Sequence, residues 1–301
     1  MTHEALVVVG VDGSESSRAA VRWAASEAEA RHARLLLVHA WHVEPSTRAA
    51  RLLLADDERP LEAAVLAEAA EQVRVLAPGV AQDTELTEGR PDEALLTAAA
   101  HASLLVLGRG EQGRVRLGST LGHVSVRSGC PVVAVPAGPG DVVGPVVVGV
   151  DGSLLSEDAV AFAFGQAARR GLPLTAVLAI PPSYGVYLPG EPELELVRET
   201  GRRHLAEALA GWSERYPEVQ VRQVVSLDAP LVALQEAGAR ASLLVVGSHG
   251  RGALLRAALG SVSGSLLRSS TCPLAVVRPP VPAAEPVPAV GNPVPVPLTY
   301  L

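Results

Sequence analysis

Short, uninterrupted runs of apolar residues recur along the chain, and each is followed by a stretch with helical spacing. The first run, Leu6 to Val11, ends in Asp-Gly-Ser and precedes an Ala-rich segment from Ser16 to Arg31. A run of this kind is typical of a strand buried on both faces, followed here by a helix. The same reading predicts further strands in the first half at 35–40, 84–86, 104–107 and 132–135, and further helices at 61–76, 92–101 and 117–127.

The second half repeats this order. Strands are expected near 146–150, 174–180, 219–225, 243–246 and 274–277. Alternation of strands and helices predicts a mostly parallel sheet covered by helices on both faces. In such sheets, ligands bind beyond the carboxyl ends of the strands, where the strand order reverses.

The halves are also similar in sequence. VVVGVDGS at 7–14 recurs at 146–153, an offset of 139 residues, whereas CPVVAV at 130–135 matches CPLAVV at 272–277 at an offset of 142. The halves therefore differ by three residues, and the difference falls between Gly108 and Gly118. We expect two homologous domains, each an open five-stranded sheet, at 1–137 and 146–278, a linker at 138–145, and a Pro-rich tail at 279–301 that is polyproline-like or disordered.

Composition excludes several classes of function. All 25 cationic residues are arginine, so there is no lysine for a Walker A loop or a Schiff base. A net charge of −7 argues against non-specific binding to nucleic acid. The chain has no apolar run of membrane-spanning length and no signal peptide pattern, so we expect a cytoplasmic protein. Cys130 and Cys272 have no partner at metal-ligand spacing and are expected to be packed, unpaired thiols.

Glycine-rich segments follow the fourth strand of each half. GRGEQGRVRLGS at 108–119 contains G-x-G-x-x-G, but no acidic residue lies between Glu111 and Asp141, so a dinucleotide fingerprint is rejected. Its counterpart, GSHGRGALLRAALGS at 247–261, reads G-x2-G-x9-G-S. Backbone N–H groups of such a loop, together with a helix N-terminus, can hold a phosphate chain without lysine, and Arg251 or Arg256 could balance its charge. A plain connection between strand and helix is the alternative.

Together with VGVDGS, LLVVGSHGRG, GSVS and CPLAVV, this pattern makes the chain resemble the universal stress protein family, as a tandem of two such domains over about 5–136 and 145–278. The resemblance implies a Rossmann-like fold of the adenine-nucleotide alpha-hydrolase type, and ATP binding in members that carry the glycine signature. Mg²⁺ could accompany the ATP through phosphate oxygens, with no direct side-chain ligand.

The resemblance also assigns site residues in the second half. It implies that Asp151 lies near the ribose and Ala179 beside the adenine, and that the phosphates are lined by Gly247, Gly250, Gly260, Ser261 and Ser263. Asp151 has an alternative role as a turn or capping residue in Asp-Gly-Ser. His249 lies in the phosphate loop and either contacts a phosphate or is a plain loop residue.

The first half departs from this pattern. Its matching positions are Asp12, Ala40, Gly108, Gly118 and Ser119, but its loop is three residues shorter and Leu121 stands in place of Ser263. Arg109, Arg114 and Arg116 could attract an anion, although a solvated basic loop is the preferred interpretation. We therefore expect the second half to bind ATP, and the first half to bind it weakly or to have a structural role.

Three functions follow as hypotheses. The first is a nucleotide-dependent regulator of a stress or dormancy response, with slow or no hydrolysis. The second is an ATP-hydrolysing or nucleotidyl-transferring enzyme, against which the lack of a dedicated base and of a G-x-S-x-G elbow counts. The third is an interaction module that binds no nucleotide and captures a protein partner through the Pro-rich tail. The resemblance also implies that the halves pack about a pseudo-twofold axis near their closing strands; a homodimer is left open.

Overall fold

A computed structural model describes residues 5–41, 48–110, 120–138, 143–181, 190–249 and 259–278, with the backbone alone for 48–59, 154 and 155. The first half contains β1 (Leu6–Gly10), α1 (Glu15–Arg31), β2 (Arg34–Trp41), α2 (Arg48–Leu76), β3 (Gln82–Glu88), α3 (Pro91–Ala98), a 3-10 turn (Ala99–His101), β4 (Leu104–Arg109), α4 (Thr120–Arg127) and β5 (Val132–Pro136). The second contains β6 (Val146–Gly149), α5 (Leu154–Arg170), β7 (Leu174–Ala179), α6 (Glu191–Arg215), β8 (Val221–Ser226), α7 (Pro230–Gly238), β9 (Leu243–Gly247), α8 (Ser261–Ser269) and β10 (Leu274–Val277). The predicted alternation is confirmed in both halves.

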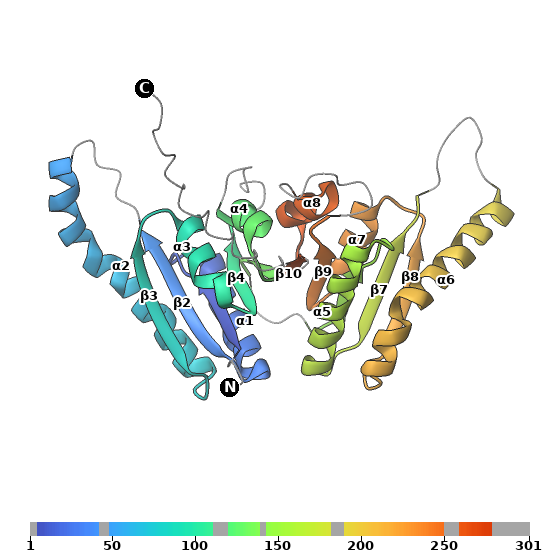
Figure 1. Ribbon diagram of the computed structural model, residues 1–301, viewed down its shortest axis with the longest axis horizontal. Helices are drawn as coiled ribbons and strands as arrows, with labels where there is room; N and C mark the ends of the chain where they lie inside the picture. Colours follow the sequence, from blue (N-terminus) through green and yellow to red (C-terminus); the bar gives the residue numbers. More distant parts are fainter. Residues whose placement is uncertain are drawn as a thin grey trace, which may run out of the picture.

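The strands form one ten-stranded sheet in the order β3-β2-β1-β4-β5-β10-β9-β6-β7-β8. Pairs within each half are parallel, and the halves join where β5 pairs antiparallel with β10, Leu274 opposite Ala134 and Val276 opposite Val132. Each half is thus the expected five-stranded sheet, and the closing strands meet at the centre of the molecule (Figure 1). The pairing covers two apolar strands that would otherwise be exposed sheet edges.

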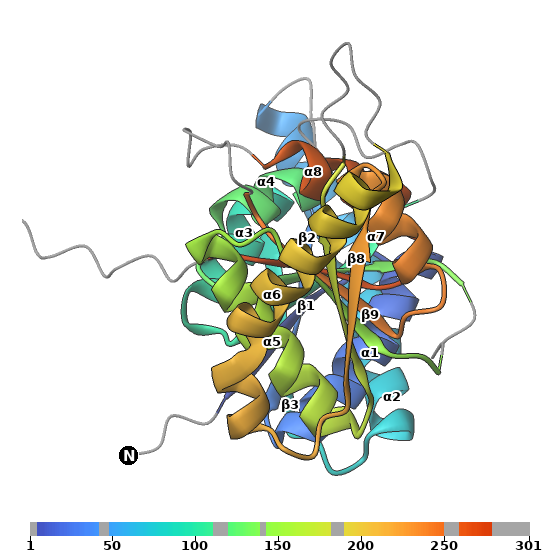
Figure 2. The same cartoon turned by 90° about the vertical axis from the view of Figure 1, so that its right-hand side faces the viewer.

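Helices cover both faces of the sheet. Along β1, Val7 and Val9 belong to one buried cluster and Val8 to another, as the period of two residues in a strand requires. The first cluster contains residues of α1, α2, α5 and α6, and the second contains residues of α3, α4, α7 and α8. Figure 2 shows this for the second half, where α5 and α6 lie on one side of the strands and α7 on the other.

The largest differences from the expected lengths are in α2 and β3. α2 starts at Arg48 and continues through Pro60, whereas we expected the second helix to start at Leu61. β3 extends from Gln82 to Glu88 because it pairs with β2 along that whole length. Its sequence, QDTELTE, is half exposed at the sheet edge, so its hydrophobic pattern is weak.

A buried polar network joins the halves on the α1 and α5 face. The Glu27 carboxylate, 1% exposed, accepts hydrogen bonds from Arg31 Nε at 2.5 Å, Arg170 Nη2 at 2.7 Å and Gln166 Nε2 at 2.6 Å. Glu27 and Gln166 are equivalent positions of the repeat, as are Arg31 and Arg170. Because the equivalent position of the second half carries an amide, the pair forms a hydrogen bond where two carboxylates would repel each other.

Further sequence-based expectations concern the cysteines, membrane-spanning helices, the linker and the tail. Cys130 and Cys272 are buried free thiols, as expected. None of the helices described is long and apolar enough to cross a bilayer. The Pro-rich tail at 279–301 and residues 139–142 of the expected linker lie outside the described residues.

Candidate functional site

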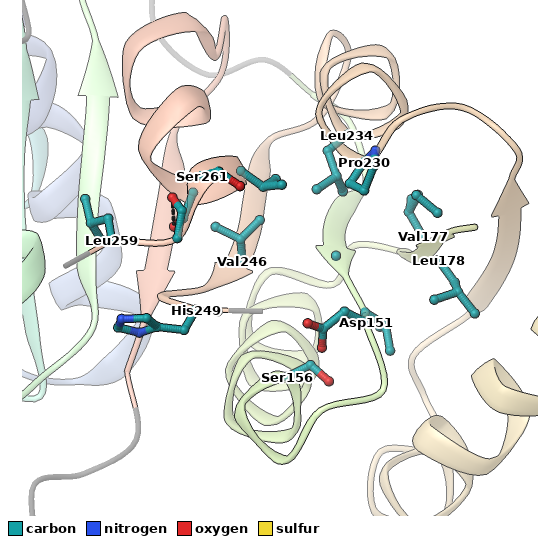
Figure 3. Close-up of a pocket in the computed structure, with 17 residues that line it drawn as sticks. Asp151, Ser156, Val177, Leu178, Pro230, Leu234, Val246, His249, Leu259 and Ser261 are labelled. Atoms are coloured by element: carbon teal, nitrogen blue, oxygen red, sulfur yellow. Dashed lines mark hydrogen bonds between the residues drawn. The ribbon is translucent and has the colours of Figure 1, made fainter. Parts of the chain in front are cut away.

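A cavity of about 580 Å³ lies at the carboxyl ends of the second-half strands. It is at the point where the strand order reverses, because β6 pairs with β7 on one side and with β9 on the other. Ligands of open α/β sheets bind at this position. The cavity walls come from β6, β7 and β9, from the loop after β9, and from α7 and α8 (Figure 3).

Most of the second-half residues that the sequence analysis assigned to the site line this one cavity. They are Asp151, Ala179, Gly247, His249, Gly260, Ser261 and Ser263. Gly250, Arg251 and Arg256 lie outside the described residues. Four separate segments of the chain thus converge on one cavity, and the ligand contacts that the family resemblance implies for them stay predictions.

The start of α8 forms one end of the cavity. Gly260, the residue before the helix, donates its backbone N–H to the Ser248 carbonyl at 2.8 Å, and it has no side chain to cap the first turn. The Ser263 hydroxyl donates to the same carbonyl, at 3.0 Å, and to the Gly260 carbonyl, at 3.1 Å. Ser263 therefore fixes the loop against the helix. The helix N-terminus, with Ser261 at its first turn, presents partial positive charge to the cavity.

Asp151 lies in the cavity between the start of α8 and the apolar residues of β7 (Figure 3). Its Oδ1 accepts hydrogen bonds from the Ser153 backbone N–H at 2.9 Å and from the Ser153 hydroxyl at 2.6 Å. The alternative role of Asp151 as a turn residue is thus present in the structure. The same carboxylate also faces the cavity beside Ser156 (Figure 3).

The other end of the cavity is apolar. In Figure 3, Val177 and Leu178 lie on one side of Asp151 and Pro230 and Leu234 lie above it, whereas His249 and Ser261 lie on the other side together with Val246 and Leu259. The apolar wall suits a flat ring and the polar end suits an anion. Sequence reasoning did not name the four residues of β7 and α7. Val177 and Leu178 could have been found because they precede Ala179 in the strand, but Pro230 and Leu234 belong to α7 and carry no local signal.

The first half has the same framework with different side chains. Asp12 makes the same turn, its Oδ1 accepting the Ser14 N–H at 3.0 Å. In the first half, Leu107 occupies the position that Val246 has in the second half. A Cβ placed on Gly10 would lie 2.4 Å from Leu107 Cδ2, whereas a Cβ placed on Gly149 would lie 3.5 Å from Val246 Cγ1. The larger side chain therefore fills space that the second half leaves open.

Other first-half substitutions are also buried. His39 is equivalent to Leu178 and precedes Ala40 near the end of β2. Its Nδ1 lies 2.6 Å from the Val11 carbonyl oxygen, and its Nε2 lies 2.6 Å from Glu62 Oε2. Leu121 packs into the apolar cluster where Ser263 has a hydroxyl. Gly118 and Ser119 lie outside the described residues.

One interpretation of the first-half loop is wrong. Arg109 was expected in a solvated basic loop, but it is the last residue of β4 and only 4% exposed. It is buried because β4 continues two residues past Leu107 and pairs with Pro136 of β5. Arg114 and Arg116 lie outside the described residues.

Gly108 has a packing role that can be tested. A Cβ at this position would lie 2.6 Å from Ser16 C and 2.6 Å from Ser17 N, both backbone atoms of α1, whereas a Cβ on Gly110 would meet nothing within 4 Å. Gly108→Ala should therefore lower the free energy of unfolding by about 1–3 kcal/mol in urea titrations. Gly110→Ala, the matched control, should change it by less than about 0.5 kcal/mol. Equal effects of the two substitutions would contradict this assignment.

Comparison with known proteins agrees with this architecture. The model of the universal stress protein family matches the chain twice, at residues 6–136 and 143–278. The chain belongs to the universal stress protein family. This tandem universal stress protein is 38% identical to a universal stress protein of Mycobacterium tuberculosis over 286 residues, which cover 90% of this chain and 96% of that protein. It is 39% identical to one from Mycolicibacterium smegmatis over 292 residues, covering 91% and 97%.

The fold is also found among solved structures. The crystal structure of a universal stress protein from Archaeoglobus fulgidus superposes with a TM-score of 0.67 at 20% identity. It covers 91% of this universal stress protein and 98% of its own chain. The mixed α/β architecture with a largely parallel sheet is therefore that of the family.

Proposed function

We propose that the second half of this universal stress protein binds ATP with Mg²⁺, and that occupancy of the site regulates a stress or dormancy response with slow or no hydrolysis. The observation that carries the proposal is the convergence of Asp151, Ala179, Gly247 and the start of α8 on one cavity of about 580 Å³. A pocket with apolar walls and a few converging polar groups is the usual form of a small-molecule site.

The two ends of the cavity suggest the orientation of the nucleotide. The adenine would lie against Val177, Leu178 and Leu234, the ribose beside Asp151, and the phosphates at the N-terminus of α8. Among the described residues, no group of three His, Cys, Asp or Glu side chains could hold a metal. Mg²⁺ would therefore be held mainly by phosphate oxygens, where it neutralises phosphate charge, and it would reach Asp151 through water.

Ser248 and His249 form a polar pair beside the cavity. His249 Nδ1 lies 3.0 Å from the Ser248 hydroxyl, a spacing that a base and a nucleophile could share. Ser248 is only 1% exposed, so its hydroxyl cannot reach a bound nucleotide. Ser248 is therefore not placed to act as a side-chain nucleophile in nucleotidyl transfer, and the regulatory role is proposed on the binding site alone.

The nucleotide content of the purified chain tests the proposal. The protein would be denatured and the released nucleotide separated by chromatography and expressed per mole of chain. We expect one adenine nucleotide per chain, because the cavity that gathers the described site residues lies in the second half. Two per chain would contradict our account of the first half. None, together with no rise in melting temperature when ATP is added, would contradict ATP binding itself.

A further inference from the structure

A second cavity, of about 600 Å³, lies between the two halves on the α1 and α5 face, and we call it the interdomain cavity. Its walls are Arg22 and Trp23 of α1, the end of β5, the C-terminal end of α5 and the turns before β9 and β10. Ser242, just before β9, lines the interdomain cavity, whereas Gly247, the last residue of β9, lines the proposed nucleotide cavity. The two cavities thus lie at opposite ends of this strand, and they share none of their described lining residues.

Cationic side chains outnumber anionic ones in the interdomain cavity. Arg22, Arg169 and Arg170 line it, and Glu29 is the one carboxylate among its described lining residues. The half-buried Arg22 donates from Nη2 to the Gly138 carbonyl at 3.2 Å and makes no ion pair with a described residue. An anion in this cavity would therefore meet a guanidinium whose charge is not yet paired.

The buried network beside the cavity adds to this positive charge. One carboxylate, that of Glu27, lies 2.5 Å from Arg31 Nε, 2.7 Å from Arg170 Nη2 and 4.0 Å from Arg169 Nη2. Three guanidinium groups thus share a single negative charge. Burial and the nearby Arg31 guanidinium lower the pKa of Arg169, which shows the same excess of positive charge.

Trp23 brings a hydrogen-bond donor without an acceptor to the same cavity. The residue is 5% exposed, and its Nε1 has no hydrogen-bond partner in the part of the chain that the structure describes. Buried indole N–H groups usually have an acceptor. The Arg170 guanidinium covers the ring, with Cζ 4.8 Å from the ring centroid. The face of the indole is thus occupied, and its N–H edge is the part that still lacks a partner.

The internal repeat supplies a comparison, because a smaller cavity of about 400 Å³ has equivalent residues in its walls. Both cavities contain arginines, but the smaller one lacks the added donors. The equivalents of Arg22, Trp23 and Ser26 in the smaller cavity are Ala161, Phe162 and Gly165. In addition, the smaller cavity has Asp158, which would repel an anion, where the interdomain cavity has Ala19. The two halves have thus diverged toward an anion site on one side of the Glu27 network.

We propose that the interdomain cavity binds a small organic carboxylate, with Arg22 as the paired cation and the Trp23 N–H as a second donor. A planar guanidinium fits a carboxylate through two parallel hydrogen bonds. Val135, Leu172 and Pro273 line the same cavity and suit an apolar body better than a polyphosphate. The site does not rest on the proposed nucleotide function, because it lies at the other end of β9 and uses other residues.

Thermal unfolding of the full chain tests the site. The ligands are sodium benzoate and sodium hexanoate, with benzamide and hexanamide as neutral counterparts, at an ionic strength held constant with sodium chloride. We expect at least one carboxylate to raise the midpoint of wild type by roughly 2–4 °C at about ten times its Kd, in a saturable way. The amides should leave the midpoint unchanged, because they carry no charge for Arg22.

Three variants link the shift to the cavity. Arg22→Ala and Trp23→Phe each introduce the residue that the smaller cavity has, and the repeat already holds a phenylalanine there under a guanidinium. Arg18→Ala is the control, since Arg18 is an arginine of the same helix that pairs with Glu68 and is not among the lining residues. We expect Arg22→Ala to abolish the carboxylate shift, Trp23→Phe to raise Kd by roughly 2- to 10-fold, and Arg18→Ala to respond like wild type.

Three outcomes overturn the proposal. They are no shift with either carboxylate, an equal shift with the amides, and a carboxylate shift that persists unchanged in Arg22→Ala. Asp151→Ala keeps this test separate from the proposed nucleotide site. We expect Asp151→Ala to retain the full carboxylate shift, and a failure of ATP binding alongside an intact carboxylate shift would contradict the proposed function alone.

Discussion

Replacing Glu27 by leucine should lower the free energy of unfolding by about 3–5 kcal/mol, the cost of breaking a buried ion pair by removing one partner. Arg31, Arg170 and Gln166 all donate to this one carboxylate. Without it, two guanidinium groups and an amide between α1 and α5 lose their acceptor. Denaturant unfolding followed by circular dichroism measures the loss.

The same carboxylate should make stability fall in acid. Burial alone would raise the pKa of Glu27, but the Arg31 and Arg170 guanidinium groups outweigh it and hold the pKa below its usual value of 4.5. A lowered pKa in the folded state means that the unfolded chain binds the proton more readily. The contribution of Glu27 is therefore complete above pH 4.5 and is lost as the pH falls through the lower, folded value. Glu27→Leu should lack this part of the acid dependence.

A surface ion pair provides the control for Glu27. Arg18 Nε lies 2.9 Å from Glu68 Oε1, with the two side chains 47% and 63% exposed. Water and salt screen such a pair, so Glu68→Gln should lower the free energy of unfolding by less than about 1 kcal/mol. If Glu27→Leu lowers the free energy of unfolding by no more than Glu68→Gln does, the network does not hold the halves together.

Replacing Asp151 by alanine should weaken ATP binding by roughly 10- to 100-fold, because a hydrogen bond to a charged group contributes about 1.5–3 kcal/mol. The carboxylate faces the cavity from the end of β6 and is the acidic side chain among its described lining residues. Isothermal titration calorimetry with ATP and Mg²⁺ measures the change.

Asp12→Ala separates the loss of a ligand contact from the loss of a turn. Asp12 accepts the Ser14 N–H at 3.0 Å as Asp151 accepts the Ser153 N–H at 2.9 Å, so both substitutions break the same kind of turn. We expect Asp12→Ala to retain ATP binding. Equal losses from the two substitutions would show that turn stability, or a nucleotide in both halves, explains the effect.

Much of the fold could be predicted from local patterns. Apolar runs buried on both faces identify the central strands, because a parallel sheet between two helix layers leaves no polar face. The internal repeat then aligns the halves. Since the carboxyl ends of parallel strands meet at one edge, the sequence pattern is enough to place Asp151, Ala179 and Gly247 together. The polar edge strand β3 and the helix through Pro60 were poorly predicted, because their patterns are set by exposure and by packing on neighbouring elements.

The sequence by itself therefore determined the two α/β halves, their family and the strand ends that meet at the second-half cavity. The tertiary structure alone decided which polar residues are buried and what they face. Glu27 and Gln166 are 139 residues apart and share a hydrogen bond of 2.6 Å. Leu234 reaches the cavity from α7, and Arg109 in a basic segment is buried without a counter-ion among the described residues. The physical reason is that a residue's type and local spacing describe its own element, whereas its burial and charge environment depend on distant segments that pack over it.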